Sequence, residues 1–107
     1  MSPRSTFAIV FAPQVLDHLA AIERNYHSMI RESIEEQITF TPLSQTRNRK
    51  PLSQPAPFNA TWELRFGRDN QFRVFYEVDD TAMIVSILAI GIKEGSKLRI
   101  GREEIEV

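Results

Sequence analysis

The sequence predicts an α+β fold in which an N-terminal strand and a helical hairpin precede a three-stranded antiparallel sheet. Two patterns carry this prediction. Apolar residues recur at helical spacing between residues 13 and 38, and they alternate with polar residues between residues 61 and 78. The chain has 107 residues and is 42% hydrophobic, which suits one compact core. We therefore expect a single domain spanning 1–107.

The first part of the chain predicts one strand and two helices. Residues 6–11 (TFAIVF) are short, apolar and β-branched, which is typical of a buried strand. The proline that opens residues 13–24 suits the first turn of an amphipathic helix. Its apolar stripe at helical spacing consists of Val15, Leu16, Leu19, Ala20 and Ile22. A second helix over 28–38 has Ser28 as its N-cap and an apolar stripe formed by Ile30, Ile34 and Ile38. The short joint between them predicts an antiparallel hairpin whose apolar stripe packs on the later strands.

Residues 41–60 differ from both neighbouring segments because they contain four prolines among serines and asparagines. This composition predicts an irregular connection over most of the segment. A long connection without regular structure is often functional, and this one carries the basic residues Arg47, Arg49 and Lys50. The alternative is a solvent-exposed linker whose basic residues have no particular role.

Alternation predicts two strands at 61–66 and 72–78, joined by a turn at 67–71. Closing this hairpin pairs Arg65 with Arg73. A slip by one residue would turn both arginines into the core, so the register is strongly favoured. The nearly continuous apolar run at 83–92 suits a central strand, and residues 93–107 suit one short extra strand with a tail.

The two faces of the predicted hairpin differ in character. We expect one face to bury the helices with Trp62, Leu64, Phe66, Phe72, Val74, Tyr76 and Val78. We expect the other to stay open with Glu63, Arg65, Arg73, Phe75 and Glu77. On these faces Tyr76 is structural, whereas Phe75 either stacks on a base or packs under the basic connection.

The pairing of Arg65 with Arg73 places like charges side by side, which costs stability unless an anion lies between them. Glu63 or Glu77 could supply that anion internally, and an external phosphate could supply it otherwise. Residues 44–75 carry six basic and two acidic side chains on a chain with a net charge of −1. This distribution favours a local anionic partner such as a phosphate backbone, although scattered surface charge is the alternative.

Several classes of chemistry find no support in the sequence. The chain has no cysteine, which removes disulfides, thiolate metal sites and a cysteine nucleophile. Its two histidines, His18 and His27, do not form a metal-binding pattern, and we interpret them as helix-surface or joint residues. No cofactor motif, signal peptide or membrane-length apolar run is present, so we expect a cytoplasmic protein without a cofactor.

Four short sequence segments, in this order along the chain, resemble those of the RelE/ParE superfamily of bacterial toxins from type II toxin–antitoxin systems. They are RKPL at 49–52, WELRF at 62–66, FRVFYEV at 72–78 and ILAIGIK at 87–93. The resemblance extends from about residue 7 to 104 and implies a RelE-like β-α-α-β-β-β fold. It also implies a cognate antitoxin and one of two targets. One branch of the superfamily cleaves messenger RNA on the ribosome without a metal, and another poisons DNA gyrase.

The resemblance also assigns candidate site residues. It implies that Arg73, Arg65 and Lys93 act catalytically by stabilising the phosphorane-like transition state. The remaining basic candidates for RNA binding are Arg47, Arg49, Lys50, Arg68, Lys97 and Arg99. The chain departs from the family at Thr61 and Glu63, which align with lysines. It departs again at Arg99, which stands near the C-terminal tyrosine position. The general acid and base are therefore not identifiable from the sequence.

Our leading hypothesis is a toxin that acts as a ribosome-dependent endoribonuclease on messenger RNA. A non-enzymatic gyrase poison is the alternative that the missing general acid favours. A third hypothesis is a catalytically degenerate protein that keeps the toxin fold and only binds its antitoxin.

Overall fold

The computed structural model describes residues 6–106 and confirms the α+β class. Its helices and strands are β1 (Ala8–Phe11), α1 (Gln14–Ala20), α2 (His27–Ile38), β2 (Arg49–Pro51), β3 (Trp62–Phe66), β4 (Phe72–Asp79), β5 (Ile84–Glu94), β6 (Lys97–Ile100) and β7 (Glu103–Glu106). Short 3-10 turns occupy Arg24–Tyr26, Pro57–Asn59 and Arg68–Asn70. The expected domain also included residues 1–5 and 107, which lie outside the described residues.

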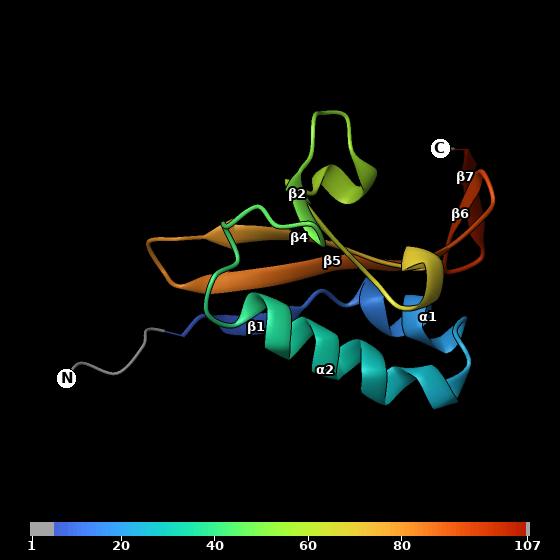
Figure 1. Ribbon diagram of the computed structural model, residues 1–107, viewed down its shortest axis with the longest axis horizontal. Helices are drawn as coiled ribbons and strands as arrows, with labels where there is room; N and C mark the ends of the chain where they lie inside the picture. Colours follow the sequence, from blue (N-terminus) through green and yellow to red (C-terminus); the bar gives the residue numbers. More distant parts are fainter. Residues whose placement is uncertain (1–5, 107) are drawn as a thin grey trace.

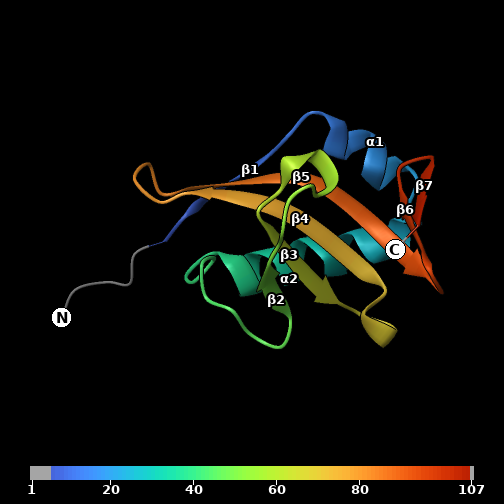
Figure 2. The ribbon, with the colours of Figure 1, turned by 90° about the horizontal axis from the view of Figure 1, so that it is seen from above.

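The sheet is larger than the three strands that the sequence predicts. Its strands follow the order β2-β3-β4-β5-β6-β7 with antiparallel pairing, and β1 adds to β5 in parallel. Figures 1 and 2 show α1 and α2 on one side of this sheet. The predicted strands β3, β4 and β5 form its centre. The segment predicted as one extra strand with a tail instead forms the β6–β7 hairpin.

The first strand forms as expected, but the prediction that it is buried is wrong. β1 pairs only with β5, so it lies at an edge of the sheet. The side chains of Val10 and Phe11 are 49% and 43% exposed. Position in the sheet, which composition alone does not fix, decides this exposure.

Both helices form, with boundaries that differ from the prediction. α1 ends at Ala20 rather than near residue 24, and Leu16 is 72% exposed although it belongs to the predicted apolar stripe. His27 Nε2 lies 2.9 Å from both the Leu19 and the Ile22 carbonyl oxygens, so this residue closes the end of α1. α2 begins at His27, which places Ser28 inside the first turn instead of at the N-cap.

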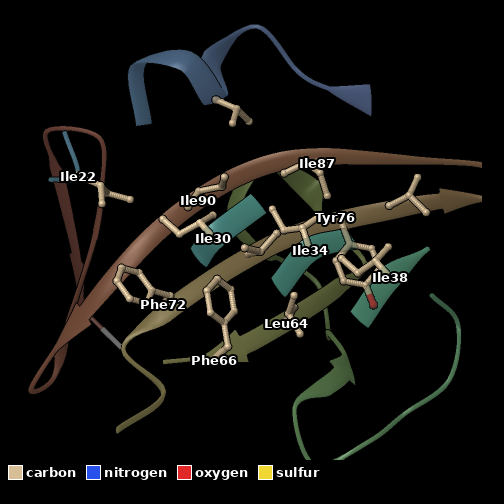
Figure 3. Packing of buried hydrophobic residues seen from close by; sticks show 13 residues of the cluster. Ile22, Ile30, Ile34, Ile38, Leu64, Phe66, Phe72, Tyr76, Ile87 and Ile90 are labelled. Carbon is tan, nitrogen blue, oxygen red and sulfur yellow. The ribbon is translucent and has the colours of Figure 1, made fainter. Parts of the chain in front are cut away.

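The main core lies between α2 and the sheet, as the periodicity predicts (Figure 3). The stripe of Ile30, Ile34 and Ile38 is buried against apolar side chains of β3, β4 and β5. Tyr76 belongs to this core, where its hydroxyl donates a hydrogen bond to the Pro42 carbonyl at 2.8 Å. Tyr76 is fully buried, which confirms its predicted structural role, and this burial raises the pKa of its hydroxyl.

A second core covers much of the sheet face that the sequence predicts to be open. Phe75 is 2% exposed and packs with Ala60, Ala89, Leu98 and Ile100. These partners come from the connection before β3, from β5 and from β6. Phe75 therefore packs beneath covering segments, and its role as an exposed base-stacking residue is wrong. The alternative that it packs under the connection is the correct one.

The proline-rich connection also contains regular structure at its centre. β2 pairs with β3 in antiparallel register, and Lys50 lies opposite Glu63. Leu52 continues the contact because its N–H donates to the Thr61 carbonyl at 2.9 Å. The remainder consists of turns and bends, in agreement with the prediction of an irregular segment.

Candidate anion-binding site

Three of the predicted site residues come together in a hollow of about 330 Å³ at one end of the sheet. Its lining consists of Arg68, Asp69, Gln71, Arg73, Lys93, Glu94 and Gly95. The antiparallel pairing of β4 with β5 creates the hollow, because Arg73 lies opposite Gly91 and the Lys93 N–H donates to the Gln71 carbonyl at 2.7 Å. The turn between β3 and β4 contributes Arg68.

Arg73 is the most deeply placed cation of the hollow, with 7% of the residue exposed. Its Nε donates to the Asn70 carbonyl at 2.9 Å, which fixes the guanidinium against the turn. Burial lowers the pKa of Arg73, nearby Arg65 lowers it further, and Glu63 opposes both effects. The guanidinium stays positively charged because its usual pKa exceeds about 12.

Arg65 lies opposite Arg73 as the predicted register requires, and this pairing is confirmed. Glu63 Oε1 accepts a hydrogen bond from Arg65 Nε at 2.6 Å, and Glu63 Oε2 lies 3.8 Å from Arg73 Nη1. Glu63 therefore acts as the internal carboxylate that the sequence left open as an alternative. Sequence alone could not choose it over Glu77, which is exposed.

A second basic hollow of about 230 Å³ lies along the β2–β3 edge. Arg47 and Lys50 line it with exposed side chains, and Arg65 reaches it from β3. Arg49 also contacts this hollow but is only 6% exposed, because it lies opposite Leu64 on the helix side of the sheet. Its Nη1 lies within hydrogen-bonding distance of the carbonyl oxygens of Gln37 and Thr41. The structure thus places this guanidinium at the end of α2 instead of on an open surface.

Lys97 and Arg99 do not join the hollow around Arg73. Both alternate along β6 with the buried residues Leu98 and Ile100, so they lie on the opposite side of that strand from the second core. Each makes an ion pair, Lys97 with Glu104 at 3.6 Å and Arg99 with Glu94 at 3.5 Å. Lys97 is thereby separate from the hollow, whereas Arg99 contacts its rim through Glu94, which lines it.

Two carboxylates in the hollow were not singled out from the sequence. Asp69 lies in the β3–β4 turn and Glu94 at the end of β5, and both line the same hollow as Arg73 and Lys93. A carboxylate beside a bound phosphate can accept a proton. The predicted hairpin register did not extend to β5, and it is the observed pairing of β4 with β5 that brings Glu94 next to the arginine. Within residues 6–106, no group of three or more acidic or histidine side chains is placed to hold a metal ion.

An apolar groove of about 340 Å³ lies on the helical side, between β1, α1 and α2. Phe11, Leu16 and Leu19 line one part of it, and Ile30 and Ile34 line another. Sequence periodicity assigned these side chains to the core and therefore gave no sign of an open groove. No helix of residues 6–106 is long and apolar enough to span a membrane.

Comparisons with known proteins agree with this fold. Residues 9–95 match the family model for the ParE toxin of the type II toxin–antitoxin system parDE. The toxin–antitoxin complex RelBE2 from Mycobacterium tuberculosis is a similar solved structure, with a TM-score of 0.66 and 22% identity over 82% of this chain and 99% of that chain. No curated protein matches the chain significantly. Because the family model spans most of the sequence, the chain belongs to the ParE toxin family of the RelE/ParE superfamily of type II toxins.

Proposed function

We propose that this toxin acts on messenger RNA at the ribosome, through the hollow that contains Arg68, Arg73 and Lys93. The observation that supports this proposal is the convergence of three cations and two carboxylates at one end of the sheet. Phosphate is recognised by this type of arrangement, and a buried arginine such as Arg73 binds it more strongly than an exposed one. The exposed residues Arg47 and Lys50 along the β2–β3 edge extend the positive surface that contacts the rest of the RNA.

Cleavage at this site needs no metal. Asp69 or Glu94 accepts the proton of the ribose 2′-hydroxyl, and the 2′-oxygen attacks the adjacent phosphorus. The bond from phosphorus to the 5′-oxygen then breaks and leaves a 2′,3′-cyclic phosphate, while the 5′-oxygen takes a proton from Lys93 or from water. Arg73 and Arg68 stabilise the charge that develops on the phosphorane-like transition state.

Expression in cells without the antitoxin tests this proposal. We expect the wild-type chain to arrest growth and to create new messenger RNA 5′ ends. Arg73→Ala should create few such ends, and Lys97→Ala, which removes an exposed cation paired with Glu104 on β7, should resemble the wild type. Equal cleavage by the wild type and Arg73→Ala would refute the role of the hollow. Growth arrest without any cleavage would refute the RNA target.

Gyrase poisoning is the second candidate, and the ion pairs of Glu63 favour it because they already neutralise part of the arginine pair. The match to the ParE family model supports it as well. This alternative predicts trapped gyrase–DNA complexes and a DNA-damage response while messenger RNA stays intact. A degenerate toxin would cause no growth defect in the same experiment.

We also propose that the cognate antitoxin covers the apolar groove between β1, α1 and α2. Contiguous exposed apolar surface marks protein interaction sites, and Phe11 and Leu16, which both line the groove, are 43% and 72% exposed. Leu16→Glu should therefore leave toxicity unchanged and reduce neutralisation when the protein encoded by the adjacent reading frame is co-expressed. Neutralisation equal to that of the wild type would place the antitoxin elsewhere.

A further inference from the structure

Glu63 occupies the position between the two arginines that the strand register brings face to face. It is 5% exposed, and its two carboxylate oxygens approach Arg65 at 2.6 Å and Arg73 at 3.8 Å. One carboxylate thus serves two adjacent guanidinium groups, which leaves a single excess positive charge. Without this carboxylate, the paired arginines would repel each other across the strands.

The two arginines are held in different ways. The 2.6 Å contact to Arg65 is a short, charge-assisted hydrogen bond. The 3.8 Å contact to Arg73 is longer than a hydrogen bond, and the turn carbonyl of Asn70 fixes the orientation of this side chain instead. Arg73 also lines the hollow. Arg65 is therefore committed to the carboxylate, whereas Arg73 remains available to an external anion.

We propose that Glu63 is a built-in counter-ion that competes with an incoming phosphate for Arg73. Arg65 is the positioning residue that holds this carboxylate in place through their short hydrogen bond. The carboxylate offsets the repulsion between the two arginines when no phosphate is bound. The same negative charge lowers the affinity of the site for phosphate. This inference rests on the proposed function only for the identity of the phosphate as that of RNA. The competition itself concerns any phosphate that reaches Arg73.

Glu63→Gln tests the proposal because glutamine keeps the shape of the side chain and removes its charge. Inorganic phosphate is the first probe, followed through the ¹⁵N–¹H resonance of Arg73 Nε, and a short fluorescein-labelled single-stranded RNA is the second. Both should bind Glu63→Gln roughly tenfold more tightly than the wild type at low salt. The salt dependence of RNA binding should steepen by about 0.7 in the slope of log K against log salt, as expected for one more effective phosphate contact.

Glu77→Gln is the matched control, since it removes the same charge from an exposed site on the neighbouring strand. Its affinity for both probes should stay within about twofold of the wild type. A folded Glu63→Gln protein that binds phosphate no more tightly than the wild type overturns the proposal. Tighter phosphate binding without RNA binding by either protein supports the counter-ion role and shows that the site does not hold free single-stranded RNA.

The variant also carries a stability test. If Glu63→Gln does not fold in dilute buffer, phosphate on the order of 50 mM should restore its fold, because a bound anion then replaces the missing counter-ion. Circular dichroism measures this recovery against sodium chloride at equal ionic strength. Equal recovery in both salts, or none in phosphate, contradicts the proposal.

Discussion

Three arginines on neighbouring strands have different environments because side chains alternate between the two faces of a sheet. Arg49 lies on the helix side, where its guanidinium contacts carbonyl groups at the end of α2. Arg65 and Arg73 lie on the other side and share Glu63. The predicted register placed the last two correctly. It could not place Arg49, because a proline-rich stretch concealed the short edge strand β2.

The buried position of Arg49 leads to a stability prediction. Arg49→Ala should lower the free energy of unfolding by about 2–4 kcal/mol, since the carbonyl groups of Gln37 and Thr41 lose a charged donor. Arg47→Ala, which truncates an exposed arginine two residues away, should change it by less than about 0.5 kcal/mol. Urea denaturation measures both values. Equal and small effects would show that Arg49 is an ordinary surface cation.

At the scale of elements, α1 seals a gap in the edge of β5. The pairing of β1 with β5 ends at Ile87, and that of β6 begins at Gly91. In the gap, Gln14 Nε2 donates to the Leu88 carbonyl at 2.9 Å, and His18 Nδ1 accepts from the Ile90 N–H at 3.3 Å. The prediction of His18 as a helix-surface residue is wrong, because this gap depends on how distant strands assemble.

His18 should make the stability of the fold depend on pH. Burial lowers its pKa below the usual 6.5, against the opposing effects of Asp17 and Glu103. The unfolded chain therefore binds more protons just below pH 6.5, and stability falls as the pH is lowered from there until the folded-state pKa is passed.

His18→Gln provides the comparison, since glutamine can still accept a hydrogen bond from Ile90 and does not titrate. Urea denaturation at pH 7.5 and pH 5.5 should show a larger loss of stability in the wild type than in this variant. The same pH dependence in both proteins would exclude a contribution from His18.

For the whole molecule, the sheet lies between two apolar clusters instead of beside one. The helix-facing core follows from spacing alone, as the burial of Ile30, Ile34 and Ile38 shows. The second core around Phe75 requires β6 to pair closely with β5. At this contact a Cβ on residue 91 would lie 2.7 Å from the Arg99 carbonyl oxygen, so the close approach requires Gly91. A single glycine was too weak a signal to predict that pairing.

Truncation of Phe75 tests the second core. Phe75→Ala should cost about 3–5 kcal/mol of unfolding free energy, because it leaves a cavity where the side chain is 2% exposed. Leu16→Ala removes an apolar side chain that is 72% exposed, and it should cost less than about 0.5 kcal/mol. A cost for Phe75→Ala as low as that of the control would restore the open-face prediction.

Some residues of the candidate site could be located from local sequence patterns, whereas others depended on how distant strands and turns assemble. The predicted register brought Arg65 beside Arg73, whereas the family resemblance singled out Lys93, which lines the same hollow as Arg73. The sequence predicted one extra strand within 93–107 but not its bounds or register, and alternation along β6 places Lys97 and Arg99 on the side away from the second core. The carboxylates Asp69 and Glu94 required knowledge of where two turns meet.

The most direct measurement of the central claim is the rate at which purified toxin cleaves a defined messenger RNA in a reconstituted translation reaction. Lys93→Ala should reduce this rate by at least about a hundredfold, as expected when the group that protonates the leaving 5′-oxygen is removed. Lys97→Ala removes the same type of side chain from an exposed position on β6, the strand that follows β5. It should leave the rate within about twofold of the wild type. Similar rates for all three proteins, or no cleavage by the wild type, would contradict the account.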